Sequence, residues 1–273
     1  MSAPTRISNA LDTRLSPHTT GDLALVTYLM AGFPDRESTR RWAAAAADAG
    51  AAIIELGVPF SDPIGDGPTI QRASQHALAG GMSLQDSLTL AAEIGQSSAT
   101  PVVLSSYYNP LLSLGLPAFA HRAAAIGLSG VIVLDLPLEE AEPLALALSS
   151  VNIHLIFVLS PTSPQERIVQ TAARATGFIY CMGLTGVTGA RALLDPDLPA
   201  FVARVRAVSE VPLVVGFGLS RPEHVGALAP YADGAIVGSA LIDLIEQTPP
   251  PERDEAVRRF VGAVRQACVR RHG

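Results

Sequence analysis

The chain alternates short apolar runs with longer segments in which polar and apolar positions recur at a helical spacing. Runs that are apolar at consecutive positions are typical of strands buried on both faces, as in a parallel sheet covered by helices. The pattern predicts strands at Leu23–Met30, Ala52–Leu56, Val102–Ser106, Val131–Leu134, Ile153–Leu159, Phe178–Met182, Leu213–Gly216 and Gly234–Val237. It predicts helices at Arg36–Ala49, Leu84–Ile94, Ala118–Ile126, Glu139–Ser149, Pro164–Ala175, Leu198–Val208, Pro222–Leu228 and Asp254–Val269. Eight such units in 273 residues favour a (β/α)8 TIM barrel over an open sheet, which the strand count alone does not exclude.

Two segments fall outside this repeat. Thr69–Ala79 is predicted as a short helix inserted after the second strand, and residues 1–20 as an N-terminal arm or helix that caps the barrel floor. No linker rich in glycine, proline or serine divides the chain, so residues 1–273 are expected to form a single barrel domain.

The composition excludes several classes of protein. With 48% hydrophobic and 16% charged residues the chain can form a large core, so wholesale disorder is not expected. The net charge of −6 and the lack of a basic patch argue against nucleic-acid binding. No apolar run reaches the ~20 residues of a membrane span, and the first 20 residues carry no secretory signal. Because Cys181 and Cys268 are far apart in the sequence, a reducing cytoplasm is the expected location.

The chain contains no lysine, since all 19 residues counted as Lys+Arg are arginine. Any mechanism that needs a lysine Schiff base is therefore excluded. The six histidines fall at no metal-ligand spacing, and His154 is expected at the barrel floor, so no catalytic metal is predicted.

The most informative segment is 53–71, where an apolar run ends in Glu55 and leads into a loop that holds Asp62 and Asp66. In parallel barrels, catalytic groups lie where strands run out into loops. A carboxyl in such partly dry surroundings has a raised pKa, which suits a group that both takes and gives a proton. The structural alternative is that Glu55 pairs with an arginine and that an aspartate caps a helix near Pro68. We favour an acid–base role for Glu55 and the capping role for Asp62.

Glycine-rich segments follow the last strands and predict an anion site. The turn 216–220 and the turn at Gly238–Ser239 come after the seventh and eighth strands, where loop amides and a helix N-terminus commonly bind phosphate. Ser239 could add a hydroxyl at the start of the helix 240–246. Ordinary tight turns are the alternative. Tyr107 or Tyr108, at the end of the third strand, could stack on an aromatic substrate, although Asn109-Pro110 also marks a routine turn.

Several motifs together resemble the tryptophan synthase alpha subunit family. They are E-L-G-V-P-F-S-D-P at 55–63, D-G-P-T-I-Q at 66–71, G-V-T-G-A at 186–190, G-F-G at 216–218 and A-G-F-P-D at 31–35. The similarity extends from about Leu23 to the C-terminal helix.

The resemblance implies a lyase of tryptophan biosynthesis that cleaves indole-3-glycerol phosphate into indole and glyceraldehyde 3-phosphate by a retro-aldol reaction. It assigns proton transfer between the glycerol hydroxyl and indole C3 to Glu55, and a hydrogen bond from the indole N–H to Asp66. The residues that it implies for substrate binding, the phosphate glycines among them, are Tyr180, Thr188, Gly189, Gly218, Gly238 and Ser239. Of these, Thr188 is implied to contact the aspartate when the site closes.

The resemblance also implies a beta-subunit partner in an alpha2beta2 tetramer. Pyridoxal phosphate is expected only in that partner, because this chain has no lysine to hold it. Two departures from the family pattern are Gly65 and the stretch Gly183, Leu184 and Thr185 before the G-V-T-G motif. They leave open a free-standing indole-producing lyase of secondary metabolism and a non-catalytic regulatory barrel as alternatives.

Overall fold

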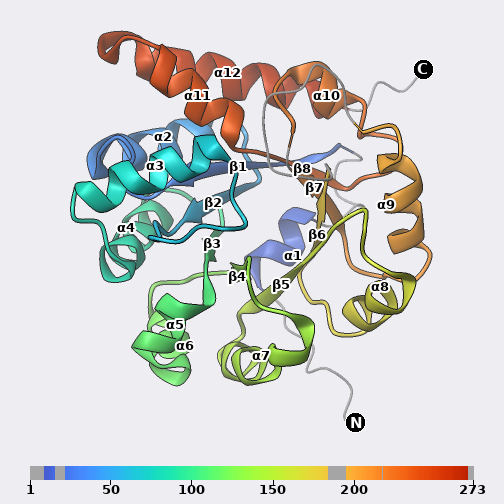
Figure 1. Cartoon of the computed structure of the whole chain (residues 1–273). Coiled ribbons are helices and arrows are strands. Elements are labelled where there is room, and N and C mark those ends of the chain that lie inside the picture. The colour runs from blue at the N-terminus through green and yellow to red at the C-terminus, as the bar shows by residue number, and fades with distance from the viewer. Residues whose placement is uncertain (1–8, 16–21, 184–194, 217, 270–273) are drawn as a thin grey trace.

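The strands of the computed structural model, which describes residues 9–15, 22–183, 195–216 and 218–269, close into a barrel (Figure 1). The strands are β1 (Ala24–Met30), β2 (Ile53–Gly57), β3 (Val102–Ser106), β4 (Gly130–Val133), β5 (His154–Leu159), β6 (Ile179–Met182), β7 (Leu213–Gly216) and β8 (Gly234–Val237). Each pairs in parallel with the next, and β8 pairs with β1. The predicted fold class is confirmed.

Apart from α1, which lies across one end of the barrel, the helices described here surround it (Figure 1). The helices are α1 (Ala10–Leu15), α2 (Arg36–Asp48), α3 (Pro68–Ala79), α4 (Leu84–Ser97), α5 (Tyr108–Leu114), α6 (Leu116–Ala125), α7 (Glu142–Ser149), α8 (Gln165–Ala172), α9 (Leu198–Arg206), α10 (Pro222–Gly226), α11 (Ser239–Gln247) and α12 (Arg253–Ala267), with 3₁₀ turns η1 (Leu138–Glu140) and η2 (Pro250–Glu252). None of the helices described here is long and apolar enough to cross a membrane.

The strands are buried on both faces, which explains their apolar sequences. All seven positions of β1 and all five of β2 are buried, and Ile53, Ile54 and Leu56 have no exposed area. Alternate residues of a strand face the barrel interior and the helix layer, and both sides exclude water here. A polar side chain on such a strand is costly, and Glu55 on β2 is one of the few that occur.

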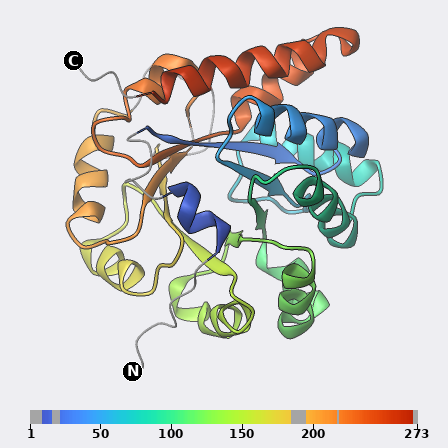
Figure 2. The same ribbon diagram turned by 180° about the vertical axis from the view of Figure 1, so that it is seen from behind.

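Helix α1 covers the amino ends of the strands, as predicted for part of the N-terminal segment. Its Leu11 and Leu15 are buried, and the Asn9 side-chain amide donates to the carbonyls of Ser129 (2.8 Å) and Asn152 (3.1 Å) just before β4 and β5. His154, the first residue of β5, lies 3.3 Å from Asp12 of α1. Figure 2 shows α1 in front of the barrel when the molecule is seen from behind. His154 is therefore a floor residue, as expected.

Two helical segments differ from the prediction. The stretch Tyr108–Leu114 is a helix, although Asn109-Pro110 indicated a turn. Pro110 lies in its first turn. A backbone N–H there has no helical acceptor, so the absence of this group in proline costs no hydrogen bond. The helix predicted at Glu139–Ser149 is divided into η1 and α7. Pro143 accounts for the break, because a continuous helix would need its absent N–H to bond to residue 139.

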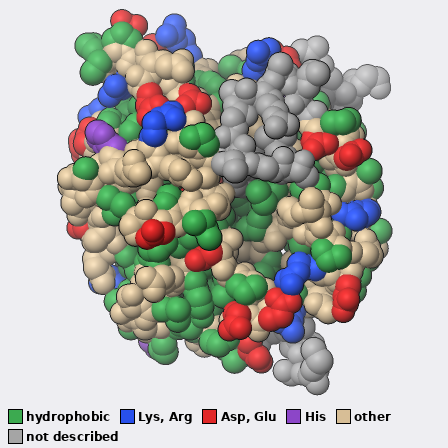
Figure 3. Space-filling view, in the orientation of Figure 1, with side chains coloured by type: hydrophobic (Ala, Val, Ile, Leu, Met, Phe, Trp, Pro, Cys, Tyr) green, Lys and Arg blue, Asp and Glu red, His purple; other side chains and the backbone are tan. Residues whose placement is uncertain are grey.

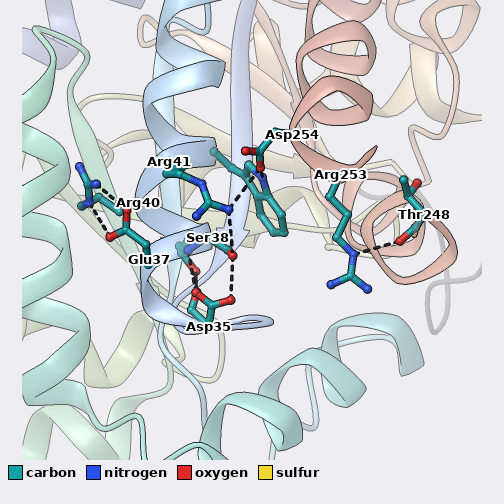
Figure 4. A network of polar contacts seen from close by, with 10 residues as sticks. Asp35, Glu37, Ser38, Arg40, Arg41, Thr248, Arg253 and Asp254 are labelled. Atoms are coloured by element: carbon teal, nitrogen blue, oxygen red, sulfur yellow. Dashed lines mark hydrogen bonds and ion pairs between the residues drawn. The ribbon is translucent and has the colours of Figure 1, made fainter. Parts of the chain in front are cut away.

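Polar contacts join α2 to α12 and so tie the first barrel unit to the last (Figure 4). The Trp42 indole, which is 1% exposed, donates to Asp254 Oδ1 at 2.7 Å. Arg41 reaches the same carboxylate oxygen at 3.4 Å and the hydroxyl of Ser38 at the same distance. The hydrogen bond from the buried indole fixes the Asp254 carboxylate between α2 and α12.

We expect Trp42→Phe to destabilise the protein by about 1–3 kcal/mol, because the ring stays buried while a hydrogen bond to a charged acceptor is lost. Arg40→Ala on the same helix is the control, since Arg40 pairs with the exposed Glu37 and such surface pairs contribute little. Urea denaturation measures the free energy of unfolding of both variants. Equal stability of Trp42→Phe and the parent chain would show that this contact does not hold α2 to α12.

Candidate active site

A cavity opens at the carboxyl ends of the strands and brings six of the eight predicted site residues together. Its lining residues are Tyr28, Glu55, Asp66, Ile70, Ser105, Leu134, Tyr180, Gly218, Leu219, Ile236, Gly238 and Ser239. The space-filling view shows a hollow near the middle of this face (Figure 3). The predicted Thr188 and Gly189, with Leu184 and Thr185, lie outside the described residues.

Glu55 projects into the cavity from the middle of β2. Its side chain is 3% exposed, and within the described residues its Oε2 has no hydrogen-bond partner. Burial raises the pKa of Glu55 to about 8, with a further increase from the charge of Asp66, while a hydrogen bond from Ser105 acts in the opposite direction. No arginine of the described part of the chain pairs with Glu55. Within the described residues, the structure therefore does not show the ion pair of the structural alternative.

Asp66 reaches the same cavity from the loop between β2 and α3. The Tyr107 hydroxyl donates to Asp66 Oδ2 at 2.9 Å and accepts from the N–H of Gly65 at 2.9 Å, so one phenol fixes both the loop and the carboxyl group. Burial raises the pKa of Asp66 to about 6, and the hydrogen bond from Tyr107 opposes that rise. The two carboxyl groups thus have pKa values on either side of neutrality.

Two tyrosines on opposite sides of the barrel lie over glycines of the next strand. A Cβ at Gly57 would collide with the Tyr28 hydroxyl, and a Cβ at Gly216 with the Tyr180 hydroxyl. Tyr28 is opposite Glu55 in the β1–β2 register. The glycines therefore leave room for both rings to line the cavity beside the carboxyl groups.

The other end of the cavity is made of backbone. Gly238 is the N-cap of α11 and Ser239 is its first residue, while Gly218 follows β7. The first amides of a helix have no intrahelical acceptor and favour an anion. The lining residues that the structure describes include no arginine, so among them an anion would be bound by amides and the Ser239 hydroxyl.

The structure corrects the interpretation of Asp62. The N-cap of α3 is Gly67, and no side chain caps that helix. Asp62 precedes the cap by five residues and instead accepts a hydrogen bond from the adjacent Ser61 hydroxyl. The prediction that Asp62 caps the helix is wrong, because glycine occupies the capping position.

Tyr107, Tyr28 and Ser105 were not among the predicted site residues. Tyr107 was considered only for stacking on a substrate. Its ring stacks on Phe60 instead, with centroids 5.0 Å apart, and its hydroxyl donates to Asp66. For Tyr28 and Ser105 the available signal was the two-residue period of β1 and β3, which places them on the same inner face as Glu55. Among the residues that the structure describes, no group of three or more His, Cys, Asp or Glu is arranged to hold a metal ion.

Comparison with known proteins gives a consistent result. The family model described as "Tryptophan synthase alpha chain" matches residues 17–268. The tryptophan synthase alpha chain of Roseiflexus castenholzii is 47% identical over 260 residues, which cover 95% of this chain and 100% of that one. That of Chloroflexus aurantiacus is 46% identical over 251 residues, which cover 92% and 94%.

Solved structures agree with these relatives. A structure of Mycobacterium tuberculosis tryptophan synthase is 36% identical, with a TM-score of 0.87 and coverage of 95% of this chain and 98% of that one. The alpha subunit from Legionella pneumophila is 34% identical, with a TM-score of 0.87 and coverage of 96% and 98%. The closed barrel, the two carboxyl groups and the match over nearly the whole sequence show that this chain belongs to the tryptophan synthase alpha chain family.

Proposed function

We propose that the cavity between Glu55, Asp66 and the glycine turns is the active site through which this protein acts. As a member of its family the protein is a carbon–carbon lyase of tryptophan biosynthesis, which cleaves indole-3-glycerol phosphate into indole and glyceraldehyde 3-phosphate. The observation that carries the proposal is the placement of two buried carboxyl groups in one cavity, with pKa values of about 8 and about 6. Pairs of carboxyl groups whose environments separate their pKa values commonly divide the roles of acid and base.

The two pKa values suggest which carboxyl takes which role. Near pH 7 Glu55 is mostly protonated and Asp66 is mostly ionised. Asp66 as carboxylate accepts the indole N–H, and Glu55 as acid delivers its proton to indole C3. The protonated ring then takes the electron pair of the breaking carbon–carbon bond. The glycerol hydroxyl gives its proton back to Glu55, so the aldehyde forms and the acid is regenerated.

The remaining predicted residues have binding roles in this proposal. Gly218, Gly238 and Ser239 hold the phosphate, and Tyr180 lines the cavity between the ends of the substrate. Thr188 and Gly189 stay predictions from the family resemblance. The apolar side chains of Ile70, Leu134 and Leu219 suit an indole ring.

A second subunit of the beta type is the partner that we infer. Ile64, on the loop between β2 and α3, is 83% exposed, and Leu112 of α5, after the adjacent strand, is 49% exposed. Exposed apolar side chains of this size at an active-site mouth favour a protein contact. Among the similar structures is an aminoacrylate-bound form of M. tuberculosis tryptophan synthase. Pyridoxal phosphate would be held by the beta subunit, because this chain has no lysine.

We expect Glu55→Gln to lower the turnover of indole-3-glycerol phosphate by about 10²–10⁴-fold, the range of a lost general acid–base group. Binding of glycerol 3-phosphate, measured by calorimetry, should change little because the phosphate end is made of backbone. Asp62→Asn, on the same loop as Asp66 but outside the cavity, is the matched control. Full turnover by Glu55→Gln would refute the assignment.

The profile of kcat/KM against pH should be bell-shaped. Activity falls below about pH 6 as Asp66 is protonated, and falls above about pH 8 as Glu55 loses the proton that it must donate. The two apparent values belong to the interacting pair. Indole release measured across this range is the test, and Glu55→Gln should remove the basic limb from any residual activity. A flat profile would contradict the assigned protonation states.

Adding a tryptophan synthase beta subunit tests whether this chain acts with such a partner. We expect turnover of the purified chain to rise at least about tenfold in the mixture, a coupling of about 1.4 kcal/mol, as is common between linked sites. Size-exclusion chromatography should show a complex larger than either chain. Fast turnover alone, with no complex, would instead identify a free-standing lyase.

A further inference from the structure

Two helices lie outside the regular barrel repeat, and both begin at the cavity. In the repeat, α12 packs on α2 and α2 packs on α4. Helix α3 is inserted between β2 and α4, and α11 between β8 and α12. The N-cap of α3, Gly67, directly follows Asp66, and α11 begins at Ser239, which lines the cavity. The two inserted helices therefore carry the two ends of the proposed substrate site.

Helix α3 holds the loop that carries Asp66. The buried Ser74 hydroxyl accepts from the N–H of Phe60 at 2.9 Å and donates to the carbonyl of the same residue at 3.0 Å. The side-chain amide of Gln71 donates to the carbonyls of Asp66 at 2.9 Å and Pro63 at 3.3 Å. Since the start and the end of this loop are bonded to one helix, the position of Asp66 follows that of α3.

Helix α3 is bonded in turn to α11, and the two helices pack against each other and against β1. The Thr69 hydroxyl, in the first turn of α3, donates to Asp243 Oδ1 at 2.9 Å. Arg72 reaches the same oxygen at 3.3 Å and Glu246 Oε2 at 2.9 Å. The Arg72 side chain is 52% exposed and that of Asp243 29%. Solvent weakens the arginine contacts, so the bond from Thr69 is the firmer link between the helices.

We propose that Thr69 and Asp243 are positioning residues, whose hydrogen bond fixes the spacing between the Asp66 carboxylate and the first amides of α11. The inference rests on the proposed function, in which one substrate places its indole N–H at Asp66 and its phosphate at α11. A ligand held at both ends gains affinity only when their spacing matches its length. A shift of α3 relative to α11 reduces that gain, whereas a ligand that occupies one end alone is unaffected.

The test compares a ligand that spans the site with two ligands that occupy one end each. The spanning ligand is an unreactive analogue of the substrate, in which a three-carbon chain without hydroxyl groups joins indole to phosphate. The single-end ligands are indole and glycerol 3-phosphate. Calorimetry on the full-length chain gives the three association constants. The spanning ratio is the constant of the spanning ligand divided by the product of the other two, so a change of charge near the phosphate cancels.

Thr69→Val keeps the size and the branched shape of the side chain and removes the hydroxyl. We expect it to lower the spanning ratio about three- to tenfold, within the range of one net hydrogen bond. The affinities for indole alone and for glycerol 3-phosphate alone should change little. The kcat/KM for indole-3-glycerol phosphate should fall by the same factor, because the transition state spans the same two ends. A parental spanning ratio or a parental kcat/KM in folded Thr69→Val would overturn the inference.

Matched variants separate the hydrogen bond from packing and from surface charge. Thr69→Ser keeps the hydroxyl and should keep the parent ratio. Asp243→Ala should lower the ratio as much as Thr69→Val, and the double variant no further, because both changes remove one bond. Glu246→Gln, on the same face of α11, alters only the exposed contact with Arg72 and should leave the ratio unchanged. A fall in Thr69→Ser or Glu246→Gln as large as that of valine, or additive losses in the double variant, would refute the assignment.

Thermal unfolding establishes that each variant is folded, and Thr69→Ala replaces Thr69→Val if the latter does not fold, with the same expected fall. The parent chain separates this inference from the proposed function. If it cleaves indole-3-glycerol phosphate and binds the spanning ligand more tightly than either single-end ligand, the proposed function stands. An unchanged ratio in the Thr69 variant then overturns the positioning role alone. An inactive parent chain, or one that binds the spanning ligand no better than glycerol 3-phosphate, would overturn both.

Discussion

The site depends on two carboxyl groups buried in one cavity, where the described part of the lining contains no cation. A buried carboxylate without a positive partner is unstable, so it retains its proton to a higher pH. Glu55 is the more deeply buried of the two, with its pKa raised to about 8, and Asp66, held by Tyr107, has its pKa raised to about 6. The raised pKa values of both carboxyl groups therefore follow from desolvation, which hydrogen bonding opposes in each case.

The barrel wall makes this arrangement possible. Parallel strands with both faces covered exclude water from the inner wall, and the β1–β2 register places Tyr28 beside Glu55. Gly57 and Gly216 have no side chain at positions where Tyr28 and Tyr180 would otherwise collide with a neighbour. The cavity thus remains open between the two aromatic rings. Glu55 projects from a strand of the barrel wall, and Asp66 is held from the loop by Tyr107.

The sequence predicts the barrel well because eight buried apolar runs of similar length have few other arrangements. It predicts Glu55 as well, since an acid inside an apolar strand has no ordinary structural role. Ser105 was missed because the two-residue period of Val-Val-Leu-Ser-Ser leaves two adjacent serines as candidates, and the strand register is needed to show that Ser105 shares the inner face with Glu55. Helix α5 was missed because Asn109-Pro110 suits a turn and a first helical turn equally well. The prediction that Asp62 caps α3 was wrong for a related reason. More than one acidic residue precedes Pro68, and the N-cap position is occupied by Gly67.

The absence of lysine limits the chemistry that the site can use. Cleavage of a carbon–carbon bond beside a hydroxyl needs an acceptor for the electron pair, and a lysine imine is one usual protein device. This chain cannot form one, but an indole ring protonated at C3 accepts the pair itself. The protein then has only to move a proton, orient the ring and hold the phosphate. In the proposed mechanism a buried acid, a carboxylate for the indole N–H and glycine-rich turns suffice for these tasks, and the residues proposed for them line one cavity.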